Sequence, residues 1–203
     1  MPGWQALQDE LSDHDFQVIA VAVDEDVDKI RSAAEGITYP VLIDADHVVT
    51  ELYAISNVPT VVLIDEHDRI VQPNWNAFSN DRFRELTGID SDAQRAAIRR
   101  WVVDGTPIIP ADEAKRAVGD LTPEEEQAKL HFRIGVHLRN AGDAAGAERN
   151  FARAGELAPF DWTNRRAAVP LQGGDPFGEP YRELAAEYQA AGRPFHGIPG
   201  TRV

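Results

Sequence analysis

The sequence predicts an α/β domain followed by a smaller all-α region. The runs at 17–23 and 60–64 are rich in Val, Ile, Leu and Thr, as buried strands are, and helical patterns lie between them. From Leu121 onward the apolar spacing is that of helices. A chain of 203 residues can form one or two domains. The expected boundaries are 1–104 for the α/β domain, 105–120 for a linker, and 121–203 for the helical region with a loosely ordered C-terminal tail.

Composition excludes several function classes. The net charge of −14 disfavours binding to nucleic-acid phosphates and to anionic membrane surfaces. The chain contains no cysteine, and therefore no disulfide, thiolate nucleophile or Cys-ligated zinc. Neither a basic-then-apolar leader nor a long apolar run occurs, which favours the cytoplasm for the chain as given. No P-loop, dinucleotide fingerprint or metal-binding His spacing is present, so we expect no cofactor.

Helical and extended patterns alternate along residues 4–53, before the second strand run at 60–64. Apolar spacing predicts a helix at 4–11, a strand at 17–23, a helix at 27–35 ended by Gly36, an extended segment at 40–43 and a short helix at 48–53. Tyr53 is interpreted as a packing residue beneath the following loop. The carboxylates of Asp24–Asp28 could hold a hard cation, but they also suit the N-terminus of the next helix. The second interpretation is favoured, because a calcium loop needs a central Gly and a terminal Glu.

The stretch around Pro59 is the most informative part of the chain. Pro59 cannot donate to a sheet, so it should occupy the first position of the strand at 60–64, after a cis Val58–Pro59 bond. A polar turn at 65–69 and a second strand at Ile70–Val71 complete a hairpin. Beyond it we expect a break at 73–76, helices at 81–87 and 92–103, and Asp92 as the cap of the second helix.

Three segments, Phe16–Asp26, Gly36–Asp46 and Val49–Val71, resemble successive motifs of the TlpA/ResA-like redoxins, which have a thioredoxin fold. The resemblance covers roughly residues 2–104. It implies that Pro59 is the cis-proline and that the surrounding loop faces an extended substrate peptide. The implied peptide-binding residues are Asn57, Val58, Pro59 and Thr60. Two departures are His67-Asp68, where the family usually has Asp-Gly, and the absence of the two catalytic cysteines.

In the resembled family a central strand and the C-x-x-C turn precede the first helix. We therefore expect them to fall upstream of Met1, and Met1 to be an internal methionine of a longer protein. Without that strand, the strands at 17–23 and 60–64 each have an open edge. They could pair directly, accept a strand from a partner or a second copy to give a homodimer, or leave an unstable fragment. Of these we expect an unstable fragment of a longer protein in the biological setting, and direct pairing in a structure of this chain alone.

The helical region resembles a single tetratricopeptide repeat. Thr122-Pro123-Glu124-Glu125 is a capped helix start, and 140–143 should form the turn between two helices. The spacing of small and large residues predicts close packing of the two helices. The predicted repeat-packing residues are Gly135, Ala147, Phe151, Ala154 and Pro159. A further helix is expected at 180–191, after a loop at 173–176.

Two functions remain open. The chain could be a relative of the TlpA/ResA-type thiol-disulfide oxidoreductases that is redox-inactive as given, with no catalytic residue of its own. Alternatively, it could be a non-catalytic thioredoxin-like and tetratricopeptide module that binds a protein or an extended peptide. Both hypotheses follow from the same fact, because thiol–disulfide exchange requires a thiolate that no residue of this chain provides.

Overall fold

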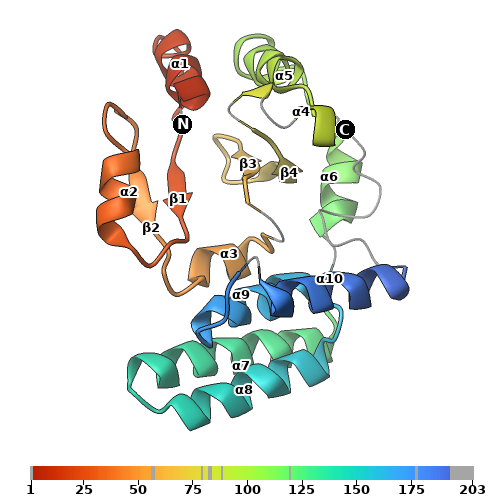
Figure 1. The fold of residues 1–203 in the computed structure, drawn as a ribbon. Helices are drawn as coiled ribbons and strands as arrows, with labels where there is room; N and C mark the ends of the chain where they lie inside the picture. The colour runs from red at the N-terminus through yellow and green to blue at the C-terminus, as the bar shows by residue number, and fades with distance from the viewer. Residues whose placement is uncertain are drawn as a thin grey trace. The chain divides into compact units, whose positions relative to one another are not determined.

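The computed structural model describes residues 2–55, 58–78, 80–81, 84–87, 89–118, 120–176 and 178–192. It divides into two compact units (Figure 1). The first contains residues 1–45 and 59–117, and the second contains 46–58 and 118–200. A short segment from the middle of the α/β region thus groups with the helices that follow it in the sequence.

The first unit is built from α1 (Pro2–Glu10), β1 (Ala20–Ala22), α2 (Val27–Ala33), β2 (Val41–Ile43), β3 (Thr60–Ile64), β4 (Ile70–Asn76), α4 (Arg84–Thr87), α5 (Ser91–Asp104) and α6 (Ala111–Val118). Its described strands form two separate pairs. The β1 and β2 strands are parallel, with Val21 opposite Leu42, and β3 and β4 are antiparallel. The predicted strand at 60–64 and the helices at 4–11 and 27–35 are confirmed within a few residues.

The core of the first unit lies between helices and the second strand pair. Leu7 of α1 and Leu11, which directly follows this helix, pack with Leu63 of β3, Trp75 of β4 and Ile98 of α5, and all five are buried. Both helices thus present apolar stripes to the β3–β4 hairpin, as their sequence spacing predicts. An ion pair between Arg99 and Glu10 joins α5 to α1 at the surface.

The predicted direct pairing of the two apolar strands is wrong. Among the described residues, β1 pairs only with β2, and β3 pairs only with β4. The β1 strand is also shorter than the predicted 17–23. Gln17 and Val18, which the prediction placed in this strand, bond instead to a side chain of α1. The Val18 amide donates to Gln8 Oε1 at 2.6 Å, and the Gln17 side-chain amide donates to the same oxygen at 3.1 Å.

The predicted break at 73–76 is also wrong, because β4 continues to Asn76. Bulges explain how a strand can contain Pro73. Leu63 lies opposite Gln72 and Val61 opposite Trp75, so β4 has one extra residue between these pairs. Pro73 lies in this bulge, where it need not donate to the ladder, and Asn74 adopts a positive φ of 41°.

Three helix features differ from the prediction. The cap of α5 is Asp90, whose side chain accepts from the Ala93 amide at 2.9 Å, and Asp92 lies inside the first turn. Within the predicted linker, Ala111–Val118 forms α6, which has acidic residues in its first turn and basic residues in its last. Trp162–Leu171 forms an unpredicted helix, α9, although it contains Pro170.

The second unit contains α3 (Val48–Leu52), α7 (Pro123–Asn140), α8 (Ala144–Leu157), α9 (Trp162–Leu171) and α10 (Glu179–Ala190). The predicted capping box at the start of α7 is confirmed: Thr122 Oγ1 accepts from the Glu125 amide, and the Glu125 carboxylate accepts from the Thr122 amide. Gly142, with a φ of 84°, allows the turn into α8. The C-terminal residues from 193 onward lie outside the described part of the chain.

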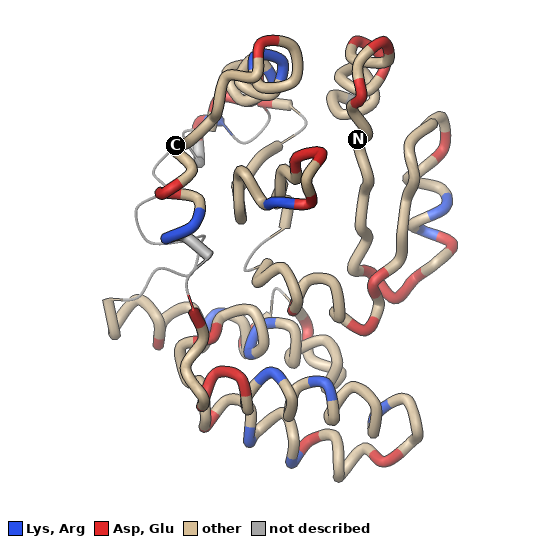
Figure 2. Tube along the Cα trace, turned by 180° about the vertical axis from the view of Figure 1, so that it is seen from behind, with Lys and Arg blue, Asp and Glu red and all other residues tan. Residues whose placement is uncertain are grey.

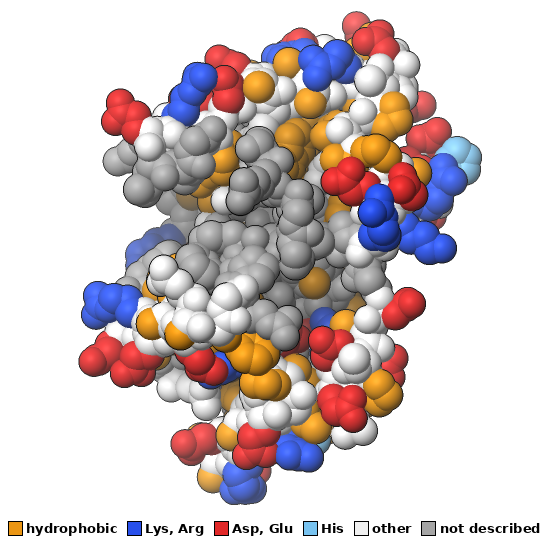
Figure 3. Space-filling model, turned by 90° about the vertical axis from the view of Figure 1, so that its right-hand side faces the viewer, with side chains coloured by type: hydrophobic (Ala, Val, Ile, Leu, Met, Phe, Trp, Pro, Cys, Tyr) orange, Lys and Arg blue, Asp and Glu red, His pale blue; other side chains and the backbone are white. Residues whose placement is uncertain are grey.

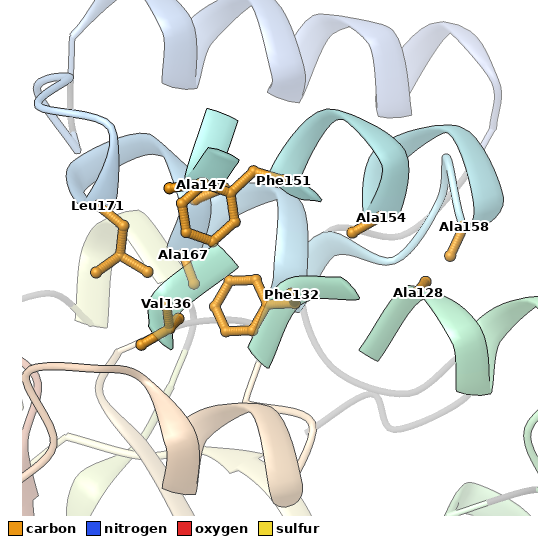
Figure 4. Packing of buried hydrophobic residues seen from close by; sticks show 10 residues of the cluster. Ala128, Phe132, Val136, Ala147, Phe151, Ala154, Ala158, Ala167 and Leu171 are labelled. Carbon is orange, nitrogen blue, oxygen red and sulfur yellow. The ribbon is translucent and has the colours of Figure 1, made fainter. Parts of the chain in front are cut away.

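Helices α7, α8 and α9 share one apolar core (Figure 4). Phe132 of α7 and Phe151 of α8 meet at its centre, with ring centroids 5.6 Å apart. Gly135 is the close-approach residue, because a Cβ built there would lie 2.7 Å from the Phe151 ring. Ala147 and Ala154 are also buried in this core, whereas Pro159 follows α8 and is exposed.

The close contact at Gly135 predicts opposite effects for two glycine substitutions. Gly135→Ala should lower the free energy of unfolding by about 1–3 kcal/mol, since the Phe151 ring must shift inside a packed core. Gly155→Ala on α8 is the matched control. Its nearest atom would be Arg165 Nε at 4.0 Å, so the gain in helix propensity should stabilise the protein by about 0.5–1 kcal/mol. Denaturant unfolding of both variants measures the difference, and equal effects would contradict the packing.

Candidate functional site

The described part of the proline loop, Val58 and Pro59, comes directly before β3 in the sequence. Val58 is 50% exposed, and Pro59 is half-buried directly before the first strand residue, Thr60. Asn57 lies outside the described residues. Tyr53, predicted to pack beneath the loop, is instead 38% exposed. The loop therefore presents one exposed apolar side chain and the backbone that leads into β3. The chain contains no thiol that could act beside them.

Asp65 organises the turn that follows β3. Its carboxylate accepts from the His67 and Arg69 amides, each at 2.9 Å, and from the Arg69 guanidinium at 2.8 Å. The Arg69 guanidinium and these amides lower the pKa of Asp65 to about 2. Asp68, at the position where the resembled family usually has Gly, adopts a positive φ of 60°, a conformation that Asp tolerates better than most residues. The departure in sequence is thus compatible with the same tight turn.

Glu51 of α3 is the most completely buried acidic residue described. Its side chain is 1% exposed, and one carboxylate oxygen accepts from Lys129 Nζ at 2.9 Å. The other accepts from the Arg133 guanidinium at 2.8 Å. Lys129 also donates to the Glu51 backbone carbonyl at 2.9 Å. Both carboxylate oxygens and one main-chain acceptor of α3 are therefore bonded to α7.

This cluster fixes the segment that leads to the proline loop. A second contact lies earlier in the segment, where Asn140 Nδ2 donates to the Asp46 carboxylate at 3.1 and 3.2 Å. Removing one member of a buried ion pair typically costs about 3–5 kcal/mol, because the remaining charge is left unpaired. Lys129 and Arg133 are four residues apart and share one face of α7, a spacing visible in the sequence. Nothing in the sequence indicates that Glu51 is their partner.

Asp161 lies in the same charged region, at the N-cap of α9. Its Oδ1 accepts from the Asn164 amide at 3.1 Å, and its Oδ2 accepts from Asn164 Nδ2 at 2.9 Å. Burial raises the pKa of the Asp161 carboxyl, while the Asn164 amide and the charge of Lys129 oppose the rise. The Asn164 Oδ1 oxygen is buried and accepts no hydrogen bond from the described residues.

An aromatic cluster joins α9 to α10. Trp162 contacts Tyr188 edge-to-face with centroids 5.0 Å apart, and Arg166 lies 5.5 Å from the centroid of the Tyr181 ring. Burial raises the pKa of the Tyr188 hydroxyl. Arg165 pairs with Glu187 at 2.8 Å, which adds a polar contact beside the rings. The cluster is a second, smaller core, and we assign it a packing role.

Other candidate sites carry less chemistry. Asp26 accepts from the Lys29 amide at 3.1 Å and caps α2, which confirms the helix-start interpretation of Asp24–Asp28. Across the described ranges, no group of three or more His, Cys, Asp or Glu residues is placed to hold a metal ion. A shallow pocket of about 390 Å³ lies beside α1 and the end of α2, lined by Gln5, Ala6, Asp9, Ala33, Glu35, Gly36 and Ile37. Within the described structure, no helix has the length and apolar character needed to cross a membrane.

Comparison with known proteins agrees with the first part of this architecture. Residues 1–72 match the model of the AhpC/TSA family. The matched stretch runs from α1 to the start of β4, and it supports a thioredoxin-fold redoxin in this region. Neither the curated proteins nor the solved structures gave a match. The chain is thus similar to redoxins over its first third, but it lacks cysteine.

The buried carboxyl of Asp161 predicts a pH-dependent effect. Asp161→Asn keeps the N-cap acceptor, and a rotated Asn164 amide could then accept from the new side-chain amide. Because the folded pKa is raised above its ordinary value of 3.8, wild-type stability decreases as pH rises through that window. The variant should therefore be more stable by about 0.5–1 kcal/mol near pH 7, and the gain should vanish near pH 3.

Thermal unfolding of both proteins across this pH range measures the gain. Asp143→Asn, which retains the cap of the Gly146 amide at the start of α8, is the matched control. If Asp161→Asn instead lowers the stability by the same amount at every pH, burial does not raise the pKa of the Asp161 carboxyl.

Proposed function

We propose that this chain is a redox-inactive relative of the TlpA/ResA-type thiol-disulfide oxidoreductases. The observation that carries the proposal is the combination of a redoxin-family match with a sequence that contains no cysteine. Redoxin chemistry begins with attack by a thiolate on a disulfide or a peroxide. No Ser, His or carboxylate of this chain can replace a sulfur atom that must form and release a disulfide.

A second proposed role is binding of a protein or an extended peptide without catalysis. The exposed Val58 and the strand-entry backbone at Pro59 and Thr60 support it, because extended peptides bind through main-chain hydrogen bonds and pockets for alternate side chains. The close α7–α8 hairpin, with Gly135 against Phe151, supports a tetratricopeptide-like repeat as a further partner surface. One face of the protein is shown in Figure 3, where acidic, basic and apolar side chains are interspersed.

The absence of thiols predicts the absence of turnover. The purified chain should neither accelerate the reduction of insulin by dithiothreitol above the rate of the reductant alone nor consume hydrogen peroxide. Turbidity of the insulin B chain and peroxide loss are the two measurements. A cysteine-containing redoxin assayed in parallel provides the positive control. Turnover by a homogeneous preparation would contradict the proposal.

Peptide binding at the proline loop predicts a local spectroscopic change. Reduced and alkylated insulin B chain, an extended polypeptide, should perturb the amide resonances of Val58 and Thr60. Val58→Lys should weaken this binding by about tenfold, since it replaces the exposed apolar contact with a charge. Leu52→Lys on α3, a position that is 58% exposed, is the matched control and should have no effect. Equal loss in the two variants, or unperturbed loop resonances at saturation, would exclude the loop as the site.

A further inference from the structure

The side of α7 that faces away from the core carries a continuous stripe of exposed residues. Phe132, at the middle of the helix, is 1% exposed and points into the core that α7 shares with α8 and α9 (Figure 4). Residues two positions before and after it are turned by about 200° around the helix and point away from that core. We name this stripe the outer face of α7. At intervals of four and three residues it contains Pro123, Gln127, Leu130, Ile134, His137 and Ala141, all of them exposed.

The centre of the outer face is apolar. Leu130 is 57% exposed and Ile134 46%, and the two lie one helical turn apart. In the part of the chain that the structure describes, nothing buries these two side chains. A stripe with alternating intervals of three and four and an apolar centre is typical of a helix that packs against another helix. The outer face therefore has the pattern of a helix contact that is not made within the described chain.

The spacing of the outer face is the same in both directions along the helix. Its members lie nine, five and two positions before Phe132, and two, five and nine positions after it. In an antiparallel helix pair with a two-fold axis at this level, Leu130 of one copy would lie against Ile134 of a second copy. Each such contact would occur twice, as an isologous interface requires. Binding to an unrelated helix does not require this symmetry, so the spacing favours a second copy of the chain as the occupant.

The charges of α7 favour the same arrangement. Its first turn contains Glu124, Glu125 and Glu126, and its last turn contains His137 and Arg139. Antiparallel pairing brings the acidic turn of one copy beside the basic turn of the other, with Glu126 close to His137 of the second copy. Parallel pairing would instead place the glutamates of both copies together. The charge pattern of α7 is thus complementary to itself only in the antiparallel direction.

The net charge of −14 does not oppose association at this surface, because the charge is unevenly distributed. Residues 121–203 contain 11 Asp or Glu and 10 Lys or Arg, whereas residues 1–120 contain 23 and 10. Figure 2 shows acidic and basic positions mixed along α7 and α8. Two copies can therefore approach each other through the helical region with little local repulsion.

We propose that the outer face of α7 binds the same face of a second copy of this chain, as an antiparallel, two-fold pair of α7 helices. Leu130 and Ile134 of both copies form the apolar centre, and Glu126 of each copy lies beside His137 of the other. One helix face is small for a protein interface, so the dimer is weak and reversible, in the micromolar range. The inference does not depend on the proposed function, because neither the lack of thiols nor the proline loop enters it.

Sedimentation of the full chain tests the dimer. The average mass should rise from the 22.4 kDa of the monomer toward twice that value as the concentration increases from about 1 to about 500 μM. Ile134→Lys places two cations in the apolar centre, one from each copy, and should weaken dimerisation by at least about tenfold. Val103→Lys on α5 is the matched control. Val103 is 53% exposed and lies outside the proposed interface, so this variant should dimerise like the wild type.

An exchange of charges separates a contact between copies from an effect on folding. Glu126→Lys and His137→Glu should each weaken dimerisation several-fold, because each removes the complementary pair, and the double variant should restore it. The two positions are about 16 Å apart along one helix, so restoration must arise between copies. Both substitutions also oppose the dipole of α7, so an effect through folding would be larger in the double variant.

A spin label distinguishes antiparallel from parallel pairing. Because the chain has no cysteine, Ala141→Cys gives a single labelling site at the end of the outer face. The position lies nine residues from the proposed axis, so the two labels of an antiparallel dimer should be about 27 Å apart along the helices. In a parallel pair they would be only about 10 Å apart. Electron paramagnetic resonance of the dimer measures this separation.

Four results would overturn the proposal. The first is a chain that stays monomeric at every concentration, and the second is a dimer that persists unchanged in Ile134→Lys. The third is a label separation that matches parallel helices. The fourth is a double charge variant that dimerises more weakly than either single variant.

Discussion

The buried carboxylate of Glu51 is the constraint on which the arrangement of the second unit depends. A charge that is 1% exposed must be neutralised, and both of its cationic partners come from α7. Helix α3 has only five residues and could not remain helical through its own hydrogen bonds. Its position is therefore determined by Lys129 and Arg133, and by the Asn140 contact to Asp46 at its N-terminal side. The segment before the proline loop is held by residues more than seventy positions later in the sequence.

This dependence changes how the family match should be understood. The match ends at residue 72, yet Asp46 and Glu51, which lie inside it, bond to α7, which lies outside it. The helical region is therefore part of the structure that holds α3 in place. A substitution at Lys129 or Arg133 of α7 can therefore disturb α3 within the second unit.

Local signals predicted the elements whose structure is decided locally. The strand at 60–64 follows from five consecutive apolar or β-branched residues after a proline, and the start of α7 follows from its capping box. The strand pairing could not be predicted, because it depends on which edges meet in space. Pro73 predicted a break, but a bulge of one residue in β4 accommodates it. At the candidate site, the position of Pro59 before β3 was predictable from its inability to donate to a sheet, whereas the Glu51 cluster depends on a contact across seventy-eight positions.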